Sequence, residues 1–344
     1  MSWYTATGSN PNHVLFSKVR YIRNEAKRNF YHLLDSKRAQ ETLNKLNSVL
    51  TSNGFRGETV AQGVSSAMLS LCEKHFIERD FAYSDRPRAL YLNEPCNLLV
   101  AVGGRDLINI TSVTSGLSVI EAENMASKAE ELIDREITFA YNDKLGYLSP
   151  APECTGSGLT FSAALYLPSL RLCKGYDALQ KNLMAKGISL LPMFSDSECR
   201  CDLYTLSYTP HYLADEDAAT VYFSDAVTCV VEREKDRIGI SLESRDKIIY
   251  ENARRALGIL LYAESVSETE MLERLSDIRL AICMQKENAP KDFPSVQDLN
   301  YLSAEGLSAS VAASAKDGCC SLEQCDLLRA SLIKRYINHK NEVS

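Results

Sequence analysis

The stretch from Leu145 to Thr160 constrains this chain more than any other part of it. Its sequence is Leu-Gly-Tyr-Leu-Ser-Pro-Ala-Pro-Glu-Cys-Thr-Gly-Ser-Gly-Leu-Thr. An apolar run follows it and ends in the step Leu167-Pro168-Ser169-Leu170. Glycines and prolines at short fixed spacings restrict the backbone far more than an ordinary amphipathic segment does. The stretch can therefore be compared with known patterns position by position.

This stretch resembles the signature of the guanidino kinases, which transfer a phosphoryl group from ATP to a guanidinium nitrogen. The family pattern is LGYLT-x-CP-x-N-x-GTGLRAS, followed by an apolar helix and a Leu-Pro-x-Leu step. The matching residues are Leu145, Gly146, Tyr147, Leu148, Pro152, Gly156, Gly158, Leu159, Ser162, Leu167, Pro168 and Leu170. Two positions differ: Ala151 replaces the reactive cysteine of the family, and Thr160 replaces a phosphate-binding arginine.

The length and charge of the chain argue against several other classes of protein. A chain of 344 residues can bury a large core, and two domains are expected from its length alone. The formal net charge of -7 argues against a nucleic-acid binder and against a protein of anionic membranes. No apolar run approaches the roughly 18 residues of a membrane span. The N-terminal residues lack the basic and apolar blocks of a signal peptide, so we expect a cytoplasmic protein.

The cysteines invite a metal-site interpretation that their spacing does not support. The chain has 11 cysteines, and several lie close together in sequence: Cys199, Cys201, Cys319, Cys320 and Cys325. None of these forms a C-x-x-C pair, and no histidine stands at ligand spacing from them. We therefore expect reduced, mostly buried thiols and no metal site.

The first part of the chain, from Trp3 to about Ser241, has the pattern of an α+β fold. Runs of β-branched and aromatic residues predict strands at 97–102, 107–113, 203–208, 220–224 and 228–233. Apolar residues at helical spacing, with acids between them, predict a helix over 120–137. This pattern predicts a mainly antiparallel sheet flanked by helices.

From about Arg245 onward the pattern predicts only helices. One amphipathic segment covers 246–263. A capping box from Ser267 to Glu270 opens a second helix that ends near Met284, and another from Ser321 to Gln324 opens a final helix that ends near Asn338. Pro290 and Pro294 mark the loop between these two helices. We therefore expect a catalytic-type domain over 1–244 and a C-terminal helical bundle over 245–344.

Among the guanidino kinases, the chain most resembles the bacterial protein-arginine kinases, which phosphorylate arginine side chains of proteins. Residues 14–24 are similar to VLSSRIRLARN of that group, with no separate helical domain before them. Residues 256–280 resemble its YGIL…LLSDLRLG stretch, and residues 325–330 its phosphoarginine-docking motif RD-x-x-RA. The resemblance implies the guanidino-kinase fold and a homodimer formed through the helical domain. It also implies association with a stress-response regulator and a protein-unfolding ATPase.

The resemblance also implies a nucleotide site, of which part is retained. Its residues here are Ser17, Lys18, Arg20, His75, Thr160 and Ser162, and Arg23 matches the family as well. Lys18 replaces an arginine, which keeps the charge but loses the bidentate grip on phosphate. His75 lies in a stretch similar to ERHLIS, whose histidine contacts the nucleotide, and this role is favoured over the alternative of an interfacial helix histidine without a ligand. Thr160, Asn109 and Leu191 replace phosphate-binding arginines, so we expect the binding of ATP with magnesium to be weak or lost.

The residues of the catalytic centre are degraded. The NEEDHLRI segment of the family aligns with residues 103–110, so its two glutamates, which include the catalytic base, become Gly104 and Arg105. Asp106 remains, whereas Ala151 removes the reactive cysteine, and we assign no catalytic residue. Three acids were considered as a replacement base: Glu94, Glu153 and Asp196. Only Glu153 lies within the signature stretch.

The docking motif of the helical domain is half retained. Asp326 and Arg329 match it, whereas Cys325 replaces its first arginine. A phosphoarginine needs both a cation and a carboxylate, and residues three apart share one face of a helix. The two residues are therefore expected either to bind phosphoarginine or to form an ordinary surface ion pair.

Three functional hypotheses follow from these residues. The first is a pseudokinase with a regulatory or binding role. The second is an active ATP-dependent protein-arginine kinase that uses Arg105, Lys18 and Glu153 in new roles. The third is a structural subunit of a larger assembly. Removing one positioned electrostatic group costs roughly 2.7–4 kcal/mol of barrier, so several such losses together favour the first hypothesis.

Overall fold

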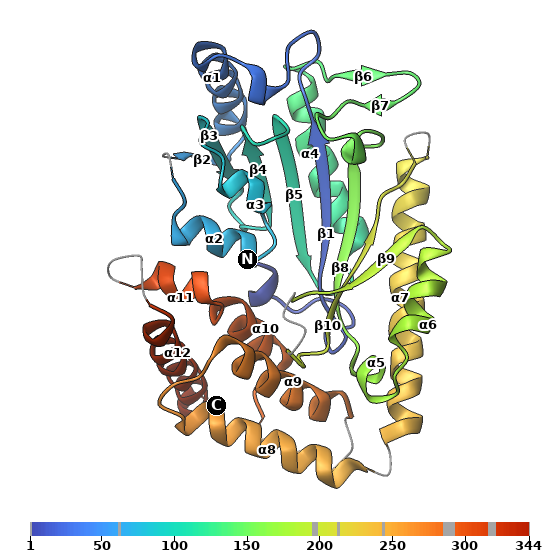
Figure 1. The fold of residues 1–344 in the computed structure, drawn as a ribbon, viewed down its shortest axis with the longest axis vertical. Helices are drawn as coiled ribbons and strands as arrows, with labels where there is room; N and C mark the ends of the chain where they lie inside the picture. The colour runs from blue at the N-terminus through green and yellow to red at the C-terminus, as the bar shows by residue number, and fades with distance from the viewer. Residues whose placement is uncertain are drawn as a thin grey trace.

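The computed structural model describes residues 2–60, 63–194, 199–211, 214–242, 245–284, 293–315 and 321–343. At its centre is an 8-stranded sheet with the order β2-β3-β4-β5-β1-β8-β10-β9 (Figure 1). Its strands are β1 (Val14–Arg23), β2 (Arg56–Val60), β3 (Arg88–Leu92), β4 (Leu98–Val102), β5 (Ile108–Ser115), β8 (Leu159–Tyr166), β9 (Ile188–Pro192) and β10 (Leu203–Tyr208). All of these pairings are antiparallel, which confirms the predicted type of sheet.

Helices cover one complete face of the sheet. The long helices α4 (Val119–Asp134) and α7 (Glu216–Leu242) pack there, together with α1 (Ser36–Ser52). On β1, Val19 and Tyr21 belong to the apolar core beneath these helices, whereas Lys18 and Arg20, which alternate with them along the strand, point to the opposite face. This alternation follows from the two-residue period of a strand. The second face of the sheet is therefore the one that can carry a polar site.

The C-terminal helices cover only part of that second face, at the lower end of the sheet in Figure 1. They are α8 (Asp246–Tyr262), α9 (Glu268–Met284), α10 (Val296–Glu305), α11 (Ser308–Ser314) and α12 (Leu322–Val343). A continuous apolar cluster joins Phe16 and Tyr166 of the sheet to Ile278, Leu299 and Ile333 of the helices. The predicted C-terminal helical bundle is thus present, and it shares a core with the sheet.

Shorter elements connect these layers. They are η1 (Trp3–Thr5), η2 (Tyr31–Leu33), α2 (Ser66–Glu73), α3 (Arg79–Ala82), β6 (Tyr141–Asn142), β7 (Gly146–Tyr147), η3 (Pro152–Cys154), α5 (Pro168–Leu172) and α6 (Tyr176–Met184). The signature stretch thus forms β7, the turn η3 and the start of β8, with Gly158 at a φ of 59° that favours glycine. It delivers the chain to the centre of the sheet, next to β1.

Two predicted strands, 220–224 and 228–233, are wrong because both lie within helix α7. Phe223, Val227 and Val231 recur at four-residue spacing and are fully buried against the sheet. Asp215 accepts a hydrogen bond from the backbone N–H of Ala218 at 2.8 Å, as a residue does at the start of a helix. Packing of one helical face has therefore overridden the strand preference of valine, threonine and aromatic residues.

The apolar run after the signature is also different from the expectation, because it forms strand β8 and not a helix. β8 lies between β1 and β10 in the middle of the sheet. Leu159, Phe161, Ala163, Ala164 and Leu165 are all fully buried. An unbroken apolar run suits a central strand that is covered on both faces, and periodicity alone does not separate it from a buried helix.

Other predictions are confirmed. Strands β4, β5 and β10 and helices α4 and α8 lie where the sequence placed them. Ser267 and Ser321 cap α9 and α12 by accepting hydrogen bonds from Glu270 and Gln324 N–H at 3.1 and 3.3 Å. Helices α10 and α11 follow Pro294 and were not predicted. Pro290 lies outside the described residues.

The described residues also bear on the cysteines and on membranes. Cys199 and Cys201 are free thiols, whereas Cys325 is disulfide-bonded, so the expectation of reduced thiols is wrong at that position. Within these ranges no group of three or more potential metal ligands occurs. No helix in the described part of the chain is long and apolar enough to cross a membrane.

Candidate functional site

The register of the sheet gathers several predicted nucleotide-site residues on its second face. On β1 and β8, Lys18 pairs with Ser162 and Arg20 with Thr160. On the other side of β1, Arg20 also faces Thr111 of β5. Residues directly opposite each other on neighbouring strands point to the same side of a sheet. The cations of β1 therefore lie in one polar row with the hydroxyls of β8.

Ser17, in contrast, points to the opposite face, so its assignment to the nucleotide site is not supported by its position. It is fully buried. Its hydroxyl donates to the carbonyl of Gly116 at 2.8 Å and accepts from the N–H of Ser118 at 3.1 Å. These bonds hold the turn that leads into α4. Ser17 thus stabilises the fold at this turn. Because neighbours in a strand point to opposite faces, Ser17 cannot share the face of Lys18.

Arg23 is also buried, with bonds to the protein itself. Its Nε donates to Glu130 at 2.8 Å, and its guanidinium carbon lies 3.5 Å from the ring centre of Tyr147. The tyrosine of the signature stretch is thereby fixed against β1. Arg23 orders the loop and does not face the open part of the sheet.

Thr160 and Ser162 lie on the expected face but bond to their neighbours. The hydroxyl of Thr160 lies 3.3 Å from that of Thr209, and the hydroxyl of Ser162 lies 3.0 Å from that of Ser207. Where the family has an arginine, Thr160 thus supplies a hydroxyl and no charge. This end of the row is polar and uncharged.

A cavity of about 550 Å³ lies between the sheet and the C-terminal helices. Lys18 forms part of its sheet side, His75 and Glu78 come from the segment after α2, and Thr269 and Leu272 come from α9. Both polar and apolar side chains line it. A site with such mixed walls can hold a ligand that combines an aromatic ring with polar groups.

His75 is held in this cavity by an unusual backbone. Helix α2 ends with the N–H groups of His75 and Phe76 bonded to the carbonyls of Cys72 and Leu71, at 3.0 and 2.9 Å. This is a Schellman arrangement, and it gives His75 a left-handed φ of 66° in a position that usually holds glycine. Strained backbone of this kind often marks functional positions.

The ring of His75 is uncharged and has an unused nitrogen. Within the described part of the chain, its buried Nε2 has no hydrogen-bond partner. Burial, helped by the charge of Lys18, lowers the pKa of His75 to about 3. The ring is therefore neutral at physiological pH and has hydrogen-bonding capacity left for a ligand.

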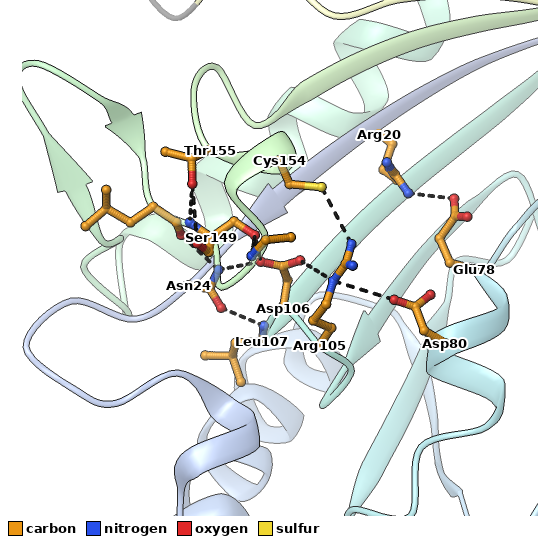
Figure 2. Close-up of polar contacts among 12 residues, drawn as sticks. Arg20, Asn24, Glu78, Asp80, Arg105, Asp106, Leu107, Ser149, Cys154 and Thr155 are labelled. Atoms are coloured by element: carbon orange, nitrogen blue, oxygen red, sulfur yellow. Dashed lines mark hydrogen bonds and ion pairs between the residues drawn. The ribbon is translucent and has the colours of Figure 1, made fainter.

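A second cavity, of about 170 Å³, adjoins the first, because Ile77 and Glu78 line both. Its charged residues are Arg20, Glu78, Asp80, Arg105 and Asp106, and Figure 2 shows these side chains around one region above the sheet. Asn109, which replaces a phosphate-binding arginine of the family, lines this cavity too. The two cavities together form the candidate site.

Glu78 lies where the two cavities meet and pairs with both cations of β1. Its Oε1 is 2.6 Å from Nη1 of Arg20 and 3.5 Å from Nζ of Lys18. The charge of Lys18, followed by that of Arg20, lowers the pKa of Glu78 to about 2 against the opposing effect of burial. Burial in turn lowers the pKa of Lys18. This carboxylate therefore neutralises the cations that the family uses for phosphate.

Sequence reasoning missed Glu78, although a signal was present. The stretch 73–78 is similar to ERHLIS, and Glu78 stands where that pattern has its serine. An acid at this substituted position, close in sequence to an expected nucleotide contact, indicates a change in the charge of the site.

At the other end of the second cavity, Asp106 is held firmly. It is buried, and its Oδ1 accepts hydrogen bonds from the amide of Asn24 and the hydroxyl of Ser149, both at 2.7 Å (Figure 2). Asn24 also accepts from the N–H of Leu107 at 2.8 Å. The orientation of Asp106 thus depends on the signature stretch and on the end of β1.

Arg105 lies between two acids of this region. Its Nε is 3.7 Å from Asp80 and 3.9 Å from Asp106, and its Nη2 donates to the sulfur of Cys154 at 3.6 Å (Figure 2). Its side chain is 45% exposed. Cys154, near the altered cysteine position, was not predicted to take part. A guanidinium of the chain itself therefore occupies the acidic end of the site.

Gly104 and Ala151, the other positions that differ from the family pattern, offer no reactive group. A Cβ atom at Gly104 would lie 3.2 Å from the ring of Phe81, so a larger residue would require that ring to shift slightly. Ala151 is buried at the start of η3.

The acids considered as a replacement base find little support. Glu94 forms an exposed ion pair with Arg56 beside the edge strand β2. The side chain of Glu153 and all of Asp196 lie outside what the structure describes. Leu191, which the resemblance aligns with an arginine of the family, is exposed on the outermost strand β9.

Arg329 of the docking motif is fully buried, which neither sequence interpretation anticipated. It pairs with Asp326 at 2.5 Å. Its other N–H groups donate to the carbonyls of Gly306 and Val266 at 2.6 and 2.8 Å and to the hydroxyl of Ser308 at 2.9 Å. The guanidinium thus joins helices α11 and α12 and has no surface for a ligand in this arrangement.

Comparison with known proteins finds matches of this chain to one family. Residues 39–237 match the sequence profile described as ATP:guanido phosphotransferase, C-terminal catalytic domain. The protein-arginine kinase of Brevibacillus brevis is 25% identical over 288 residues, covering 82% of this chain and 81% of that protein. The protein-arginine kinase of Desulforamulus reducens is 24% identical over 347 residues, covering 98% and 95%.

Solved structures show the same fold at lower identity. The duplicated taurocyamine kinase of Schistosoma mansoni has a TM-score of 0.59 and 17% identity; the match covers 79% of this chain and 41% of that longer one. A lombricine kinase has a TM-score of 0.58 and 15% identity, with 70% and 71% covered. At these identities the likeness establishes the guanidino-kinase fold alone.

Proposed function

Because the chain belongs to the ATP:guanido phosphotransferase family, we propose that it is a pseudokinase, which binds an adenine nucleotide weakly, transfers no phosphoryl group and has a regulatory or binding role. Its relatives include proteins named protein-arginine kinases. The observation that carries the proposal is the position of Arg105 between Asp80 and Asp106.

The charge of Arg105 opposes the chemistry of the family. A guanidinium substrate is cationic, so its site needs carboxylates that orient it and accept its proton. Here Arg105 and Gly104 replace the two glutamates of the family pattern. Two unit charges 4 Å apart near a protein surface interact by about 4 kcal/mol, so Arg105 repels a second guanidinium. A positive charge in place of a negative one disfavours binding of the guanidinium substrate more than the loss of the carboxylate alone would.

Nucleotide binding is supported by the larger cavity more than by the cations. The unused Nε2 of His75 and the mixed walls of the cavity suit a nucleoside. Lys18 and Arg20 remain for phosphate, whereas Thr160, Asn109 and Leu191 bring no charge. Because charge-assisted contacts are the strong ones in a phosphate site, we expect ATP with magnesium to bind weakly.

The alternative is an active protein-arginine kinase with a rearranged site. It is favoured by Asp106, which is held by Asn24 and Ser149 with its Oδ2 toward Arg105. In that case Asp106 would orient the acceptor, while Lys18, Arg105 and Glu153 would take new roles. Arg105 would first have to leave the acidic pair.

One experiment separates the two functions. The protein is incubated with ATP, magnesium and a mixed protein substrate, and protein phosphoarginine is measured. The pseudokinase proposal expects background signal, for the unmodified chain and for the double variant Gly104→Glu with Arg105→Glu, because Thr160 still leaves the transferred phosphoryl group uncompensated. Phosphoarginine that disappears in Arg20→Ala would establish the active kinase instead.

The partners form a separate part of the proposal. By analogy with the family, we propose a homodimer through the C-terminal helices and contacts with a stress-response regulator and a protein-unfolding ATPase. Sedimentation of the purified chain tests the first, and binding of the two purified partners tests the second. A monomer without such binding would favour a different biological role for the same fold.

A further inference from the structure

We propose that the carboxylate of Glu78 occupies the phosphate-binding position of the site. The site therefore binds a nucleoside in preference to a nucleotide until Glu78 moves away. This inference rests on the proposed nucleotide binding and specifies the ligand class. It concerns an acid that the chain has added, and it is independent of the lost arginines.

The geometry at Glu78 is that of an occupied anion site. One oxygen atom, Oε1, contacts both Arg20 at 2.6 Å and Lys18 at 3.5 Å. Both cations are mostly buried, with exposed side-chain fractions of 20% and 13%. Buried cations require an anionic partner, and here that partner comes from the same chain. A phosphate group would need the same two cations.

The location of Glu78 decides which part of a ligand it affects. Glu78 lines both cavities, at their junction, whereas His75 and Leu272 line only the larger one. A nucleoside can therefore occupy the larger cavity while the ion pairs remain. The carboxylate of Glu78 repels phosphates directed toward Arg20, and it already pairs with Arg20 and Lys18, the cations that the phosphates would contact.

The carboxylate has room to leave. Its side chain is 46% exposed, and Glu78 precedes the short helix α3 and has no backbone role in a strand. Displacement breaks two ion pairs and does not disturb the apolar core. The site can therefore exist in a self-occupied form and in a form open to phosphate.

Calorimetric titrations of adenosine and of ADP test this inference. Replacing Glu78 with glutamine keeps its shape and removes its charge. We expect Glu78→Gln to bind ADP about tenfold more tightly than the unmodified protein, since it releases two charge-assisted contacts to the phosphates. Adenosine affinity should change by less than about twofold. Glu94→Gln, which removes an acid from an exposed ion pair outside the site, should change neither affinity.

Two further variants guard against an effect on folding. Glu78→Ser removes the same charge with a smaller side chain and should give the same gain. Adding Arg20→Ala to Glu78→Gln should abolish the gain, because the released cation is then absent. An unchanged ratio of ADP to adenosine affinity in both Glu78 variants would overturn the role of Glu78 and leave the proposed nucleotide binding intact. No binding of either ligand to any variant would overturn the nucleotide function together with it.

Discussion

The two ends of the candidate site have changed in opposite ways. At the phosphate end, Arg20 matches the family and Lys18 keeps the charge of another arginine, and Glu78 is an additional acid that pairs with Arg20 at 2.6 Å. At the acceptor end, acids of the family have been lost and the chain has added Arg105, which lies 3.7 and 3.9 Å from Asp80 and Asp106. The charges of each end are therefore neutralised by a side chain of the same protein. The ion pair is short at the phosphate end and the ion pairs are long at the acceptor end. The comparison teaches that the proposed loss of catalysis and the proposed weakening of nucleotide binding rest on separate structural features.

The largest effect should come from the buried acid of the acceptor end. Asp106→Ala leaves the amide of Asn24 and the hydroxyl of Ser149 without their acceptor. We expect the free energy of unfolding to fall by about 2 kcal/mol, the usual cost of unsatisfied buried polar groups. Urea denaturation measures it. Asp80→Ala is the matched control, and an equal loss there would show that Asp106 is not held as described.

At the phosphate end, Arg20→Ala should weaken ADP binding by about tenfold or more, because it removes one of two cations and leaves Glu78 partly unpaired. Its effect on adenosine should be small. Calorimetry at constant ionic strength measures both ligands. Equal weakening of the two would mean that Arg20 supports the whole site and not its phosphate end.

Acidification should destabilise the protein through His75, which lines the larger cavity together with Lys18. The folded pKa of His75, about 3, lies below the ordinary histidine value of 6.5, so the unfolded chain binds the proton more readily between these values. Stability therefore falls as pH drops from 7 to 5, and His75 contributes about 1 to 2 kcal/mol of that loss. His75→Gln should lose correspondingly less than the unmodified chain over this range, as chemical denaturation at both pH values would measure. Identical losses would place the His75 pKa near its ordinary value.

The smallest effect is expected for Arg105. Its ion pairs are long and its side chain is 45% exposed, so Arg105→Gln should change the free energy of unfolding by less than about 0.5 kcal/mol. Denaturation at low and high salt measures the change. A loss comparable to that of Asp106→Ala would contradict the view that the acceptor end is loosely neutralised.

The sequence predicted the family fold and the type of sheet because those depend on long motifs and repeated patterns. The resemblance also assigned Ser17, Lys18 and Arg20 to one nucleotide site, but it did not separate Ser17 from Lys18. The period of two in a strand requires neighbours to face opposite ways, so that information was available. The β-branched and aromatic residues of α7 favour strands locally, whereas the four-residue spacing of Phe223 and Val227 indicates the helix that forms.

Other parts of the site depend on tertiary structure that local patterns do not contain. The sequence indicates that Asp326 and Arg329 can pair, but the burial of Arg329 depends on the packing of α11, which was not predicted. The contact of Glu78 with Arg20 joins residues that lie 58 positions apart. Such a contact follows from the end of α2 being fixed against β1, which only the assembled fold determines.

The junction between α2 and α11 has a consequence for how the molecule unfolds. The carboxylate of Glu73 accepts hydrogen bonds from the N–H groups of Ala309 and Ser310 at 3.1 and 3.3 Å, and Lys74 pairs with Glu305 at 2.9 Å. These bonds lie beside an apolar cluster that already crosses from sheet to helices. The two parts should therefore melt in a single cooperative transition, and hydrogen exchange in α11 should report the opening of the segment that carries His75.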